Sequence, residues 1–538
     1  MKASQIEIPM VEERGKGYRF FEILPGALSW SILILPFLIS LISVPAAAII
    51  MVGYLLMWFI KAIALNVRVL QGYKTLQQHQ AIHWQSLIDD VVAGNASHAD
   101  APKWHAKNIE RMLQAPNGIN PRDVIHAVII ATYNETRETL EPTIQAVLNN
   151  DFDPKKIMLI IAYEGRDGAQ AEQASLDLVK EFGGKVSFAM AVKHPLTEGE
   201  VRGKGGNITF AGHKLAELIK QKGIDPSHVL VTTLDSDNRP HKQYLAGLTY
   251  VYSVCHNPKH LSFQPMPMFT NNVWDAPALM RVIATSNSFW MLVQGLRPHM
   301  LRNFSSHAQP LDALIETNFW STRTIVEDGH QFWRSYFRFD GHYEVVPIFL
   351  PIYQDAVLAK GYRRTLKAQF VQIRRWAWGA SDVSYVANLG YLTKNKMNKL
   401  DVTFKFLRLL EGHVSWATSP LILLYGALIP SLLHNKNYLA VQLPIIASRI
   451  ETIALATIVV SLFMSFKILP PKPARYTHRR TVFMVLQWVL LPVTTIMYSA
   501  SAAVYSQTRL MFGKYIGSFD VTEKAVHTES GTVTSLKD

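Results

Sequence analysis

The chain has 538 residues and a formal net charge of +13, and 49% of its residues are hydrophobic. This length accommodates a sizeable folded domain together with membrane helices, since one domain takes about 100–200 residues. A nucleic-acid partner is excluded because no base-stacking module or basic stripe accompanies the charge, which instead favours attraction to anionic headgroups and to a nucleotide diphosphate. The single cysteine, Cys255, excludes a disulfide framework and a cysteine-based zinc site.

Two nearly uncharged apolar runs, residues 28–41 and 46–65, lie near the N-terminus and are separated by a short turn at residues 43–45. Each approaches the roughly 17–25 apolar residues that span a bilayer core. We therefore predict a transmembrane hairpin over residues 23–67, preceded by a cytosolic segment, residues 1–22. A buried hairpin of a soluble protein is the alternative. A cleaved signal peptide is disfavoured because the first run starts late and lacks a small-residue cleavage site.

Three further apolar stretches follow, at residues 414–433, 450–469 and 482–505, and the last has Pro492 at its middle. They predict a second group of transmembrane helices over residues 412–508. Proline removes a helical hydrogen bond and bends a helix. We therefore predict that the last stretch is a re-entrant hairpin broken near Pro492, which gives four full spans plus this hairpin.

The distribution of Lys and Arg predicts the orientation in the membrane. Basic residues crowd the N-terminal flank and residues 467–480, whereas the turn at residues 43–45 has none. Because basic loops stay inside, these flanks and the large central domain are predicted to be cytoplasmic. The re-entrant hairpin would also bring a basic cytosolic tail, residues 509–538, back to that side. The sequence thus predicts a multi-pass integral protein of the plasma (inner) membrane.

The central region alternates short apolar runs with amphipathic stretches. The runs that predict buried parallel strands are residues 124–131, 157–162, 186–192 and 229–234. Helical spacing separates them, at residues 138–148, 171–181 and 208–222. This alternation predicts an α/β fold with a doubly wound, mostly parallel sheet, whose ligands bind at the carboxyl ends of the strands. We place this domain at residues 121–365, between a juxtamembrane linker, residues 68–120, and interfacial amphipathic helices, residues 366–411.

Polar residues follow the first two predicted strands. Thr132, Tyr133, Asn134 and Glu135 come after the first strand, and Glu164 comes after the second. Exposed backbone and carboxylates at these positions suit a nucleotide. A helix cap in the first case and ordinary turn chemistry in the second explain the same residues equally well.

A glycine-rich segment, Lys204-Gly-Gly-Asn207, precedes a predicted helix. Glycines allow close approach of the backbone, a helix N-terminus favours anions, and Lys204 adds a full positive charge. The spacing is not that of a Walker A loop. A diphosphate site is one interpretation, and a flexible surface loop is the other.

Two carboxylates, Asp235 and Asp237, follow the predicted strand 229–234. Carboxylates two apart at a strand end can face one pocket, and hard oxygen ligands suit Mg²⁺ or Mn²⁺. Such an ion would neutralise the charge that grows on a departing diphosphate. Asp-x-Asp pairs are also common in turns. The metal-site interpretation therefore depends on the position of this pair after a buried strand.

A second acidic pair, Glu327 and Asp328, follows Val326. Removal of a proton from an acceptor hydroxyl needs a carboxylate within hydrogen-bond reach, and Asp328 is the candidate base. Adjacent carboxylates at a helix start also act as caps that favour the helix dipole.

Gln372, Arg375 and Trp376 lie in a stretch, residues 368–389, that mixes aromatic and basic side chains. This composition predicts an amphipathic helix at the membrane surface, and the three residues share one helical face. Trp376 can stack on a sugar ring while the other two bind hydroxyls or a diphosphate. A purely structural aromatic and basic belt is the alternative.

Taken together, these motifs resemble those of the family-2 glycosyltransferases of the membrane-bound cellulose-synthase-like and hyaluronan-synthase-like group, over roughly residues 20–515. The matching elements occur in the family's order: the turn at residues 131–135, the Lys204–Asn207 segment, the Asp235–Asp237 pair, and Glu327-Asp328 with Gln372-x-x-Arg375-Trp376. Two positions depart from the family. Glu164 stands in a turn without the family's Asp-Asp-x-Ser pattern, and Val326 replaces a threonine.

The resemblance implies a GT-A catalytic domain, a UDP-sugar donor, a divalent metal ion and inversion at the anomeric carbon. By this match Asp235 and Asp237 bind nucleotide and metal, Asp328 is the base, and Gln372, Arg375 and Trp376 line the acceptor or diphosphate site. The implied partners are a nucleotide-sugar donor, a glycan or lipid acceptor and the lipid bilayer. The sequence predicts no oligomeric state.

Three functions remain open at this stage. The leading one is a synthase that extends a polysaccharide and passes it through its own helices. The second is a single transfer to a lipid or a short glycan. The third, a non-catalytic scaffold subunit, is disfavoured because Asp237, Asp328 and Arg375 are all present.

Overall fold

The computed structural model describes residues 1–166, 168–195, 197–456, 458–517, 526–527 and 533–534. Its centre is a mixed sheet of eight strands in the order β3-β2-β1-β4-β7-β6-β8-β5. The strands β3, β2, β1, β4, β6 and β8 run in one direction, and β7 and β5 run against them. The strand bounds are β1 Ile125–Thr132, β2 Ile157–Glu164, β3 Phe188–His194, β4 Val229–Asp235, β5 Arg239–Pro240, β6 Leu261–Met268, β7 His307–Pro310 and β8 Glu344–Tyr353. Two short strands, β9 Val526–His527 and β10 Val533–Thr534, pair with each other.

Helices cover both faces of this sheet. On β1, Val128 and Ile130 point into a cluster with α5 and α8, whereas Ala127 and Ile129 point into a cluster with α7 and α10. Successive side chains of a strand face opposite sides, and both sides are apolar here because both are covered. The helices around the sheet are α5 Arg137–Leu148, α6 Ala169–Phe182, α7 Lys204–Gln221, α8 Tyr244–Val254, α9 Ala278–Gly295, α10 Leu311–Thr317 and α11 Glu327–Arg338.

The predicted fold class is confirmed as a mostly parallel α/β sheet between two groups of long apolar helices. The four predicted strands correspond to β1–β4. Strands β6 and β8 were not predicted, because each contains two prolines, Pro265 and Pro267 in β6 and Pro347 and Pro351 in β8. Proline normally argues against an interior strand since it cannot donate to the ladder. Here a register shift between Pro265 and Met266 accommodates the irregularity.

The segment predicted as a juxtamembrane linker is folded onto the domain. Helix α2, Val44–Gln80, extends well past the predicted span, and α3, Trp84–Ala93, and α4, Lys103–Gln114, follow it. Trp84 lies in the same apolar cluster as β1 and α8. Residues 84–114 therefore belong to the packed unit around the sheet.

Among the described residues, four helices are long and apolar enough to cross a membrane: Lys16–Ile42, Val44–Gln80, Tyr438–Ile468 and His478–Met511. The first is α1, the second is α2, and the third comprises α16 Tyr438–Leu455 and α17 Ile458–Ile468. The predicted hairpin near the N-terminus thus appears as α1 and α2, joined at Ser43. The protein has the helices of a membrane protein.

The predicted break at Pro492 is wrong. The segment from His478 to Met511 is one helical run, composed of α18 His478–Leu486, a 3-10 turn Gln487–Leu490, α19 Leu491–Thr494, a π-helical turn Thr495–Ala500 and α20 Ser501–Met511. Pro492 stands in the first turn of α19, where its missing N–H costs little. The 3-10 and π turns on either side absorb the irregularity without reversing the chain.

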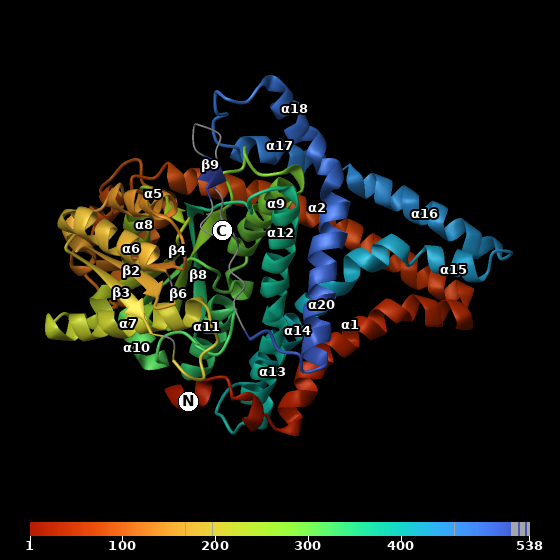
Figure 1. The fold of residues 1–538 in the computed structure, drawn as a ribbon, viewed down its shortest axis with the longest axis horizontal. Helices are drawn as coiled ribbons and strands as arrows, with labels where there is room; N and C mark the ends of the chain where they lie inside the picture. Colours follow the sequence, from red (N-terminus) through yellow and green to blue (C-terminus); the bar gives the residue numbers. More distant parts are fainter. Residues whose placement is uncertain (167, 196, 457, 518–525, 528–532, 535–538) are drawn as a thin grey trace.

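The two ends of this long helix contact different parts of the molecule. Near its start, Arg480 donates to the carbonyl of Trp274, in the loop after β6. At its end, Arg19 of α1 donates to the carbonyls of Leu510 and Met511. In Figure 1 the helix runs upright between the sheet domain and the other long helices. The segment therefore runs along this boundary as one helix, without a re-entrant hairpin.

The predicted interfacial region is also rearranged. Helix α12, Tyr362–Ala377, lies beside α20 (Figure 1), and the Ser506 hydroxyl donates to the carbonyl of Arg374 at 2.7 Å. After α13, Asp382–Ala387, a single helix α14 runs from Lys399 to Tyr425 and is followed by α15, Leu428–Leu433. The end of the predicted interfacial region and the start of the predicted span at residues 414–433 thus form one helix. Between them only Gly412 disfavours a helix, and a single glycine costs a helix about 1 kcal/mol, which does not end it here.

The crossing of α1 and α20 gives a stability prediction. A Cβ atom on Gly26 of α1 would lie 2.8 Å from the Gln507 carbonyl oxygen of α20, whereas a Cβ on Gly53 of α2 would meet nothing within 4 Å. Overpacking costs about 1–3 kcal/mol, and alanine gains about 1 kcal/mol over glycine in a helix. We expect Gly26→Ala to lower the thermal unfolding temperature in detergent and Gly53→Ala to leave it unchanged or raise it. Equal melting temperatures for the two variants would contradict the close packing of α1 against α20.

Candidate active site

The carboxyl ends of three parallel strands meet at one edge of the sheet. Ala131 of β1 pairs with Ala162 of β2 and with Asp235 of β4. Beside these ends lies a cavity of about 110 Å³, and ten of the predicted site residues line it. These are Thr132, Tyr133, Glu135, Glu164, Lys204, Asn207, Asp235, Asp237, Gln372 and Arg375. The fold therefore brings side chains that follow the strand ends together with Gln372 and Arg375 of α12.

Lys204 forms the central ion pair of the cavity. It is the first residue of α7, and its Nζ donates to Asp235 Oδ1 at 2.6 Å and to the carbonyl of Ser305 at 2.8 Å. Burial disfavours the charged lysine, but the carboxylates of Asp235 and Glu327 outweigh burial and raise the pKa of Lys204. The ammonium group is therefore charged, and with the N-terminus of α7 it gives this side of the cavity a positive potential.

The glycines that follow Lys204 are required by packing. A Cβ on Gly205 would lie 2.4 Å from the carbonyl oxygen of Ser321, and a Cβ on Gly206 would lie 3.0 Å from the ring of His194. The alternative interpretation of this segment, a flexible surface loop, is wrong, because these residues form the first turn of α7. Its glycines let this turn approach the segment that leads into Glu327.

Asn207 ties the strand ends to α7. Its side-chain amide donates to the carbonyls of Ala162 at 2.8 Å and Thr132 at 3.4 Å, and the residue is buried. It lines the cavity, while its amide nitrogen is committed to the backbone of β1 and β2. This geometry gives Asn207 a part in holding the edge of the sheet together.

Asp237 contacts the segment that follows β8. Its Oδ2 accepts from the backbone N–H of Asp355 at 3.1 Å, and its own carbonyl accepts from Asn271 at 2.9 Å. Asp237 and Asp355 both line the cavity, so carboxylates from β4 and β8 converge there. No group of three or more His, Cys, Asp or Glu side chains able to hold a metal ion occurs among the described residues.

This donor set fits Mg²⁺ or Mn²⁺ only when a ligand contributes to it. Mg²⁺ is usually held by one or two carboxylates together with substrate phosphates and water. Asp237 is a candidate protein ligand because its carboxylate lines the cavity next to Asp355. Asp355 adds a second acidic side chain on the Asp237 side of the cavity.

The turn after β1 is held by Glu135. Its carboxylate accepts from the Thr132 hydroxyl at 2.9 Å, from the backbone N–H of Tyr133 and from the Ser236 hydroxyl at 3.0 Å. Glu135 thus connects the end of β1 to the Asp235–Asp237 segment. Asn134 does not line the cavity and adopts a left-handed conformation with φ 57°, which asparagine tolerates better than most residues.

Glu164 ends β2 and forms an ion pair with Arg166. The Arg166 guanidinium lies over the ring of Tyr133, 4.2 Å from its centroid. These three side chains form one wall of the cavity region next to the β1 and β2 ends. A planar base or ribose would meet an aromatic ring and a carboxylate on this wall.

Glu327 and Asp328 begin α11 beside the cavity but do not line it. Burial, followed by the charge of Asp328, raises the pKa of Glu327 above its ordinary value. Burial also raises the pKa of Asp328. The Gly329 N–H, which donates to Asp328 Oδ1 at 2.7 Å, and the charges of Lys204 and Arg375 lower this pKa, but burial outweighs them. A carboxylate with a raised pKa has a stronger affinity for a proton.

Only two of the three predicted residues of α12 line the cavity. Gln372 and Arg375 line it, and the charge of Arg375 reaches Asp328. Trp376 instead packs into an apolar cluster, with its ring 6.5 Å from that of Phe269. Position on one helical face was therefore not sufficient to place Trp376 in the cavity.

Sequence reasoning missed two polar cavity residues, Asn272 and Asp355. Asn272 follows β6 and Asp355 follows β8. The side chain of Asn272 accepts from the backbone N–H of Ala356 at 2.7 Å and donates to the carbonyl of Ala356 at 2.9 Å. The carboxyl-end rule would have found both residues. It was not applied there because prolines concealed the two strands.

No family model and no curated protein matches the chain. Among solved structures, the mannosyltransferase PcManGT from Pyrobaculum calidifontis with GDP-Man and Mn²⁺ has 13% identity and a TM-score of 0.40, covering 84% of this chain and 100% of that one. Residues 1–349 of S. aureus TarS with UDP-GlcNAc have 12% identity and a TM-score of 0.36, covering 77% and 96%. At these values the likeness does not define the activity of this chain.

The position of Asn207 gives a test of its structural part. Asn207→Ala would leave the carbonyls of Thr132 and Ala162 without their side-chain donor, and an unsatisfied buried group costs about 1–3 kcal/mol. We expect a lower thermal unfolding temperature. Lys214→Ala, on the exposed face of the same helix, should stay within about 0.5 kcal/mol of wild type. If both variants melt like wild type, the two hydrogen bonds do not hold the strand ends.

Proposed function

We propose that the protein is a membrane-embedded, inverting glycosyltransferase of the GT-A type that transfers a sugar from a UDP-sugar to a growing polysaccharide. The observation that carries this proposal is the position of Asp328 beside a cavity that combines Lys204, Arg375 and Asp237. Cations and a candidate metal ligand for a diphosphate, with a proton acceptor next to them, are the groups that glycosyl transfer to a hydroxyl needs.

In this proposal the donor diphosphate lies against Lys204 and the N-terminus of α7, with Arg375 on the far side. The nucleoside lies toward Tyr133 and Glu164, on the wall formed by the ends of β1 and β2. Because both cations line the same cavity, they are placed to offset the negative charge of the leaving diphosphate. The donor would therefore be held by charge at one end and by stacking at the other.

Asp328 then removes the proton from the acceptor hydroxyl. The hydroxyl oxygen forms a bond to the anomeric carbon from the face opposite the diphosphate, and the bond to the diphosphate oxygen breaks with its electron pair. One displacement from the opposite face inverts the anomeric configuration. The raised pKa of Asp328 supports this role, since a base with higher proton affinity accepts the proton more readily.

Mg²⁺ or Mn²⁺ held by Asp237, with Asp235 or Asp355 beside it, would supply Lewis-acid stabilisation of the diphosphate. The residues present fit such an ion only together with substrate phosphates. Binding of the ion and of the nucleotide should therefore depend on each other.

The acceptor is proposed to approach from the membrane side, along α12 and α20. Figure 1 shows these helices between the sheet domain and the other long helices. An acceptor that reaches Asp328 from there is a glycan emerging toward the bilayer or a lipid within it. We favour a polysaccharide that leaves through the helices at the plasma (inner) membrane, with the sheet domain cytoplasmic. A single transfer to a lipid or short glycan is the alternative.

The test is an assay of purified protein with radiolabelled UDP-sugars and Mn²⁺, in which long polymer, a single addition or no product distinguishes the three functions. In that assay we expect Asp328→Asn to lower the rate of sugar transfer about 10²–10⁴-fold, because an amide cannot accept the proton. UDP affinity should remain close to wild type. Asp123→Asn, an exposed aspartate ahead of β1, is the matched control. Substantial residual transfer by Asp328→Asn would overturn the assignment of the base.

Asp237 tests the metal. We expect Asp237→Ala to weaken UDP binding in the presence of Mn²⁺ and to have little effect when a chelator is present, because the carboxylate acts through the ion. Titration calorimetry with and without Mn²⁺ measures both. An affinity that is the same as wild type under both conditions would remove Asp237 from the ligand set.

A further inference from the structure

A segment ahead of the first long helix docks beneath the candidate active site. Residues 3–13, which we call the N-terminal strap, contain two short 3-10 turns, Ala3–Ile6 and Val11–Glu13. Ile6 is 0% exposed and Ile8 is 8% exposed, and both belong to an apolar cluster with residues of α11 and α13. The strap is therefore part of the folded core, although it is separated by more than 300 residues from the helix that it touches.

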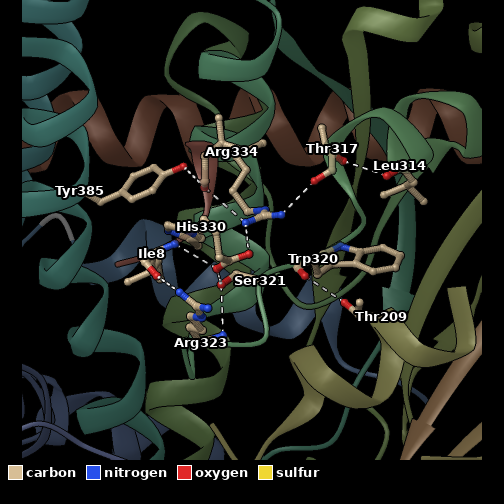
Figure 2. Close-up of polar contacts among 12 residues, drawn as sticks. Ile8, Thr209, Leu314, Thr317, Trp320, Ser321, Arg323, His330, Arg334 and Tyr385 are labelled. Carbon is tan, nitrogen blue, oxygen red and sulfur yellow. Dashed lines mark hydrogen bonds and ion pairs between the residues drawn. The ribbon is translucent and has the colours of Figure 1, made fainter. Parts of the chain in front are cut away.

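Side chains from three neighbouring segments hold the backbone of the strap, and one of them, Arg334 of α11, donates to the carbonyl of Ile6 at 3.3 Å. The carbonyl of Ile6 accepts from the Tyr385 hydroxyl of α13 at 2.6 Å, and the carbonyl of Ile8 accepts from Arg323 at 2.8 Å. Figure 2 shows Arg323 reaching Ile8 and Arg334 reaching Thr317, whose carbonyl accepts from it at 2.9 Å. The strap thus connects α13, α11 and the loop that precedes α11.

Glu7 carries the polar contact between the strap and the catalytic half of the domain. Its Oε2 accepts from Arg334 at 2.5 Å, and its Oε1 accepts from the Ser321 hydroxyl at 2.5 Å. Burial disfavours the charged carboxylate, but Arg334 and Ser321 outweigh burial and hold the pKa of Glu7 below its ordinary value. The Arg334 side chain is 0% exposed, so Glu7 supplies charge compensation to a guanidinium that water does not reach.

The two partners of Glu7 lead to the two halves of the site. Arg334 lies on α11, whose first turn carries Glu327 and Asp328. The Ser321 carbonyl packs against Gly205, where a Cβ would lie only 2.4 Å away, and Gly205 adjoins Lys204. One carboxylate therefore bears on the helix of the proposed base and, through Ser321, on the turn that carries the central cation.

We propose that Glu7 is a positioning residue that fixes the start of α11 against the start of α7, and so fixes Asp328 relative to the Lys204–Asp235 pair. This inference rests on the proposed function. A base must lie within hydrogen-bond reach of the proton that it removes, and a displacement of about 1 Å can lower the rate of the chemical step about 100-fold. The strap continues directly into α1 at Lys16, so it also connects the first long apolar helix to the proposed base.

The test is Glu7→Gln, which keeps the size of the side chain and removes its charge. We expect kcat for sugar transfer to fall about 10- to 100-fold. The KM for the donor and the affinity for UDP should stay within about twofold, because Lys204 keeps its own contacts with Asp235 and Ser305. Hydrogen exchange of the backbone over residues 318–338 should become faster. Glu12→Gln, on an exposed position of the same strap, should match wild type in all three measurements.

If Glu7→Gln is not recovered in a folded state, Ser321→Ala carries the same expectations, since it removes one hydrogen bond and retains the ion pair with Arg334. Wild-type kcat, unchanged exchange over residues 318–338, or a loss of UDP affinity as large as the loss of kcat would each overturn the proposal. The proposed function fails separately if the wild-type protein transfers no sugar. In that case the exchange measurement still shows whether Glu7 holds α11 and its loop.

Discussion

The site depends on one ammonium group placed among carboxylates. Lys204 pairs with Asp235 at 2.6 Å, and the charges of Glu327 and Asp328 also act on it. Without a cation, carboxylates gathered in a partly dehydrated space would take up protons and lose their function as ligands or bases. The arrangement requires β4, α7 and α11 to meet within a few ångströms. That meeting in turn requires glycine at position 205, because any side chain there would displace the Ser321 carbonyl.

The sequence predicted the site residues that follow regular strands. Strands β1, β2 and β4 are continuous apolar runs, so their ends could be located within one or two residues, and Thr132, Glu164 and Asp235 follow from the rule that ligands bind at carboxyl ends. Strands β6 and β8 each contain two prolines, which the interior of a sheet tolerates only with an irregular register. Asn272 and Asp355 were missed for that reason, although no special chemistry distinguishes them from the residues that were found.

The sequence predicted which segments form long apolar helices, but it did not predict the course of the last of them. Length and hydropathy identify helices that can cross a bilayer, but they do not show whether the chain continues or turns back within such a segment. At Pro492 the sequence predicted a reversal, because proline breaks the hydrogen-bond ladder. The structure shows 3-10 and π turns that absorb the break while the helix continues to Met511. Contacts at its two ends join this helix to distant segments, Arg480 to Trp274 and Arg19 to Leu510. Such contacts join distant segments, and local periodicity does not encode them.

The strap is the clearest case of information that resides only in the fold. Locally, Ile6-Glu7-Ile8 is a short alternation of apolar and acidic residues that could belong to any exposed segment. Its meaning comes from a buried arginine 327 positions away, which needs a carboxylate that the surrounding apolar cluster cannot provide. Since the strap is continuous with α1, tension or displacement of that helix would be transmitted to Glu7, and from Glu7 to the two elements that frame the proposed reaction. The first long helix is thus connected to the elements around the proposed site through the strap, and not only through the connections that precede and follow the sheet.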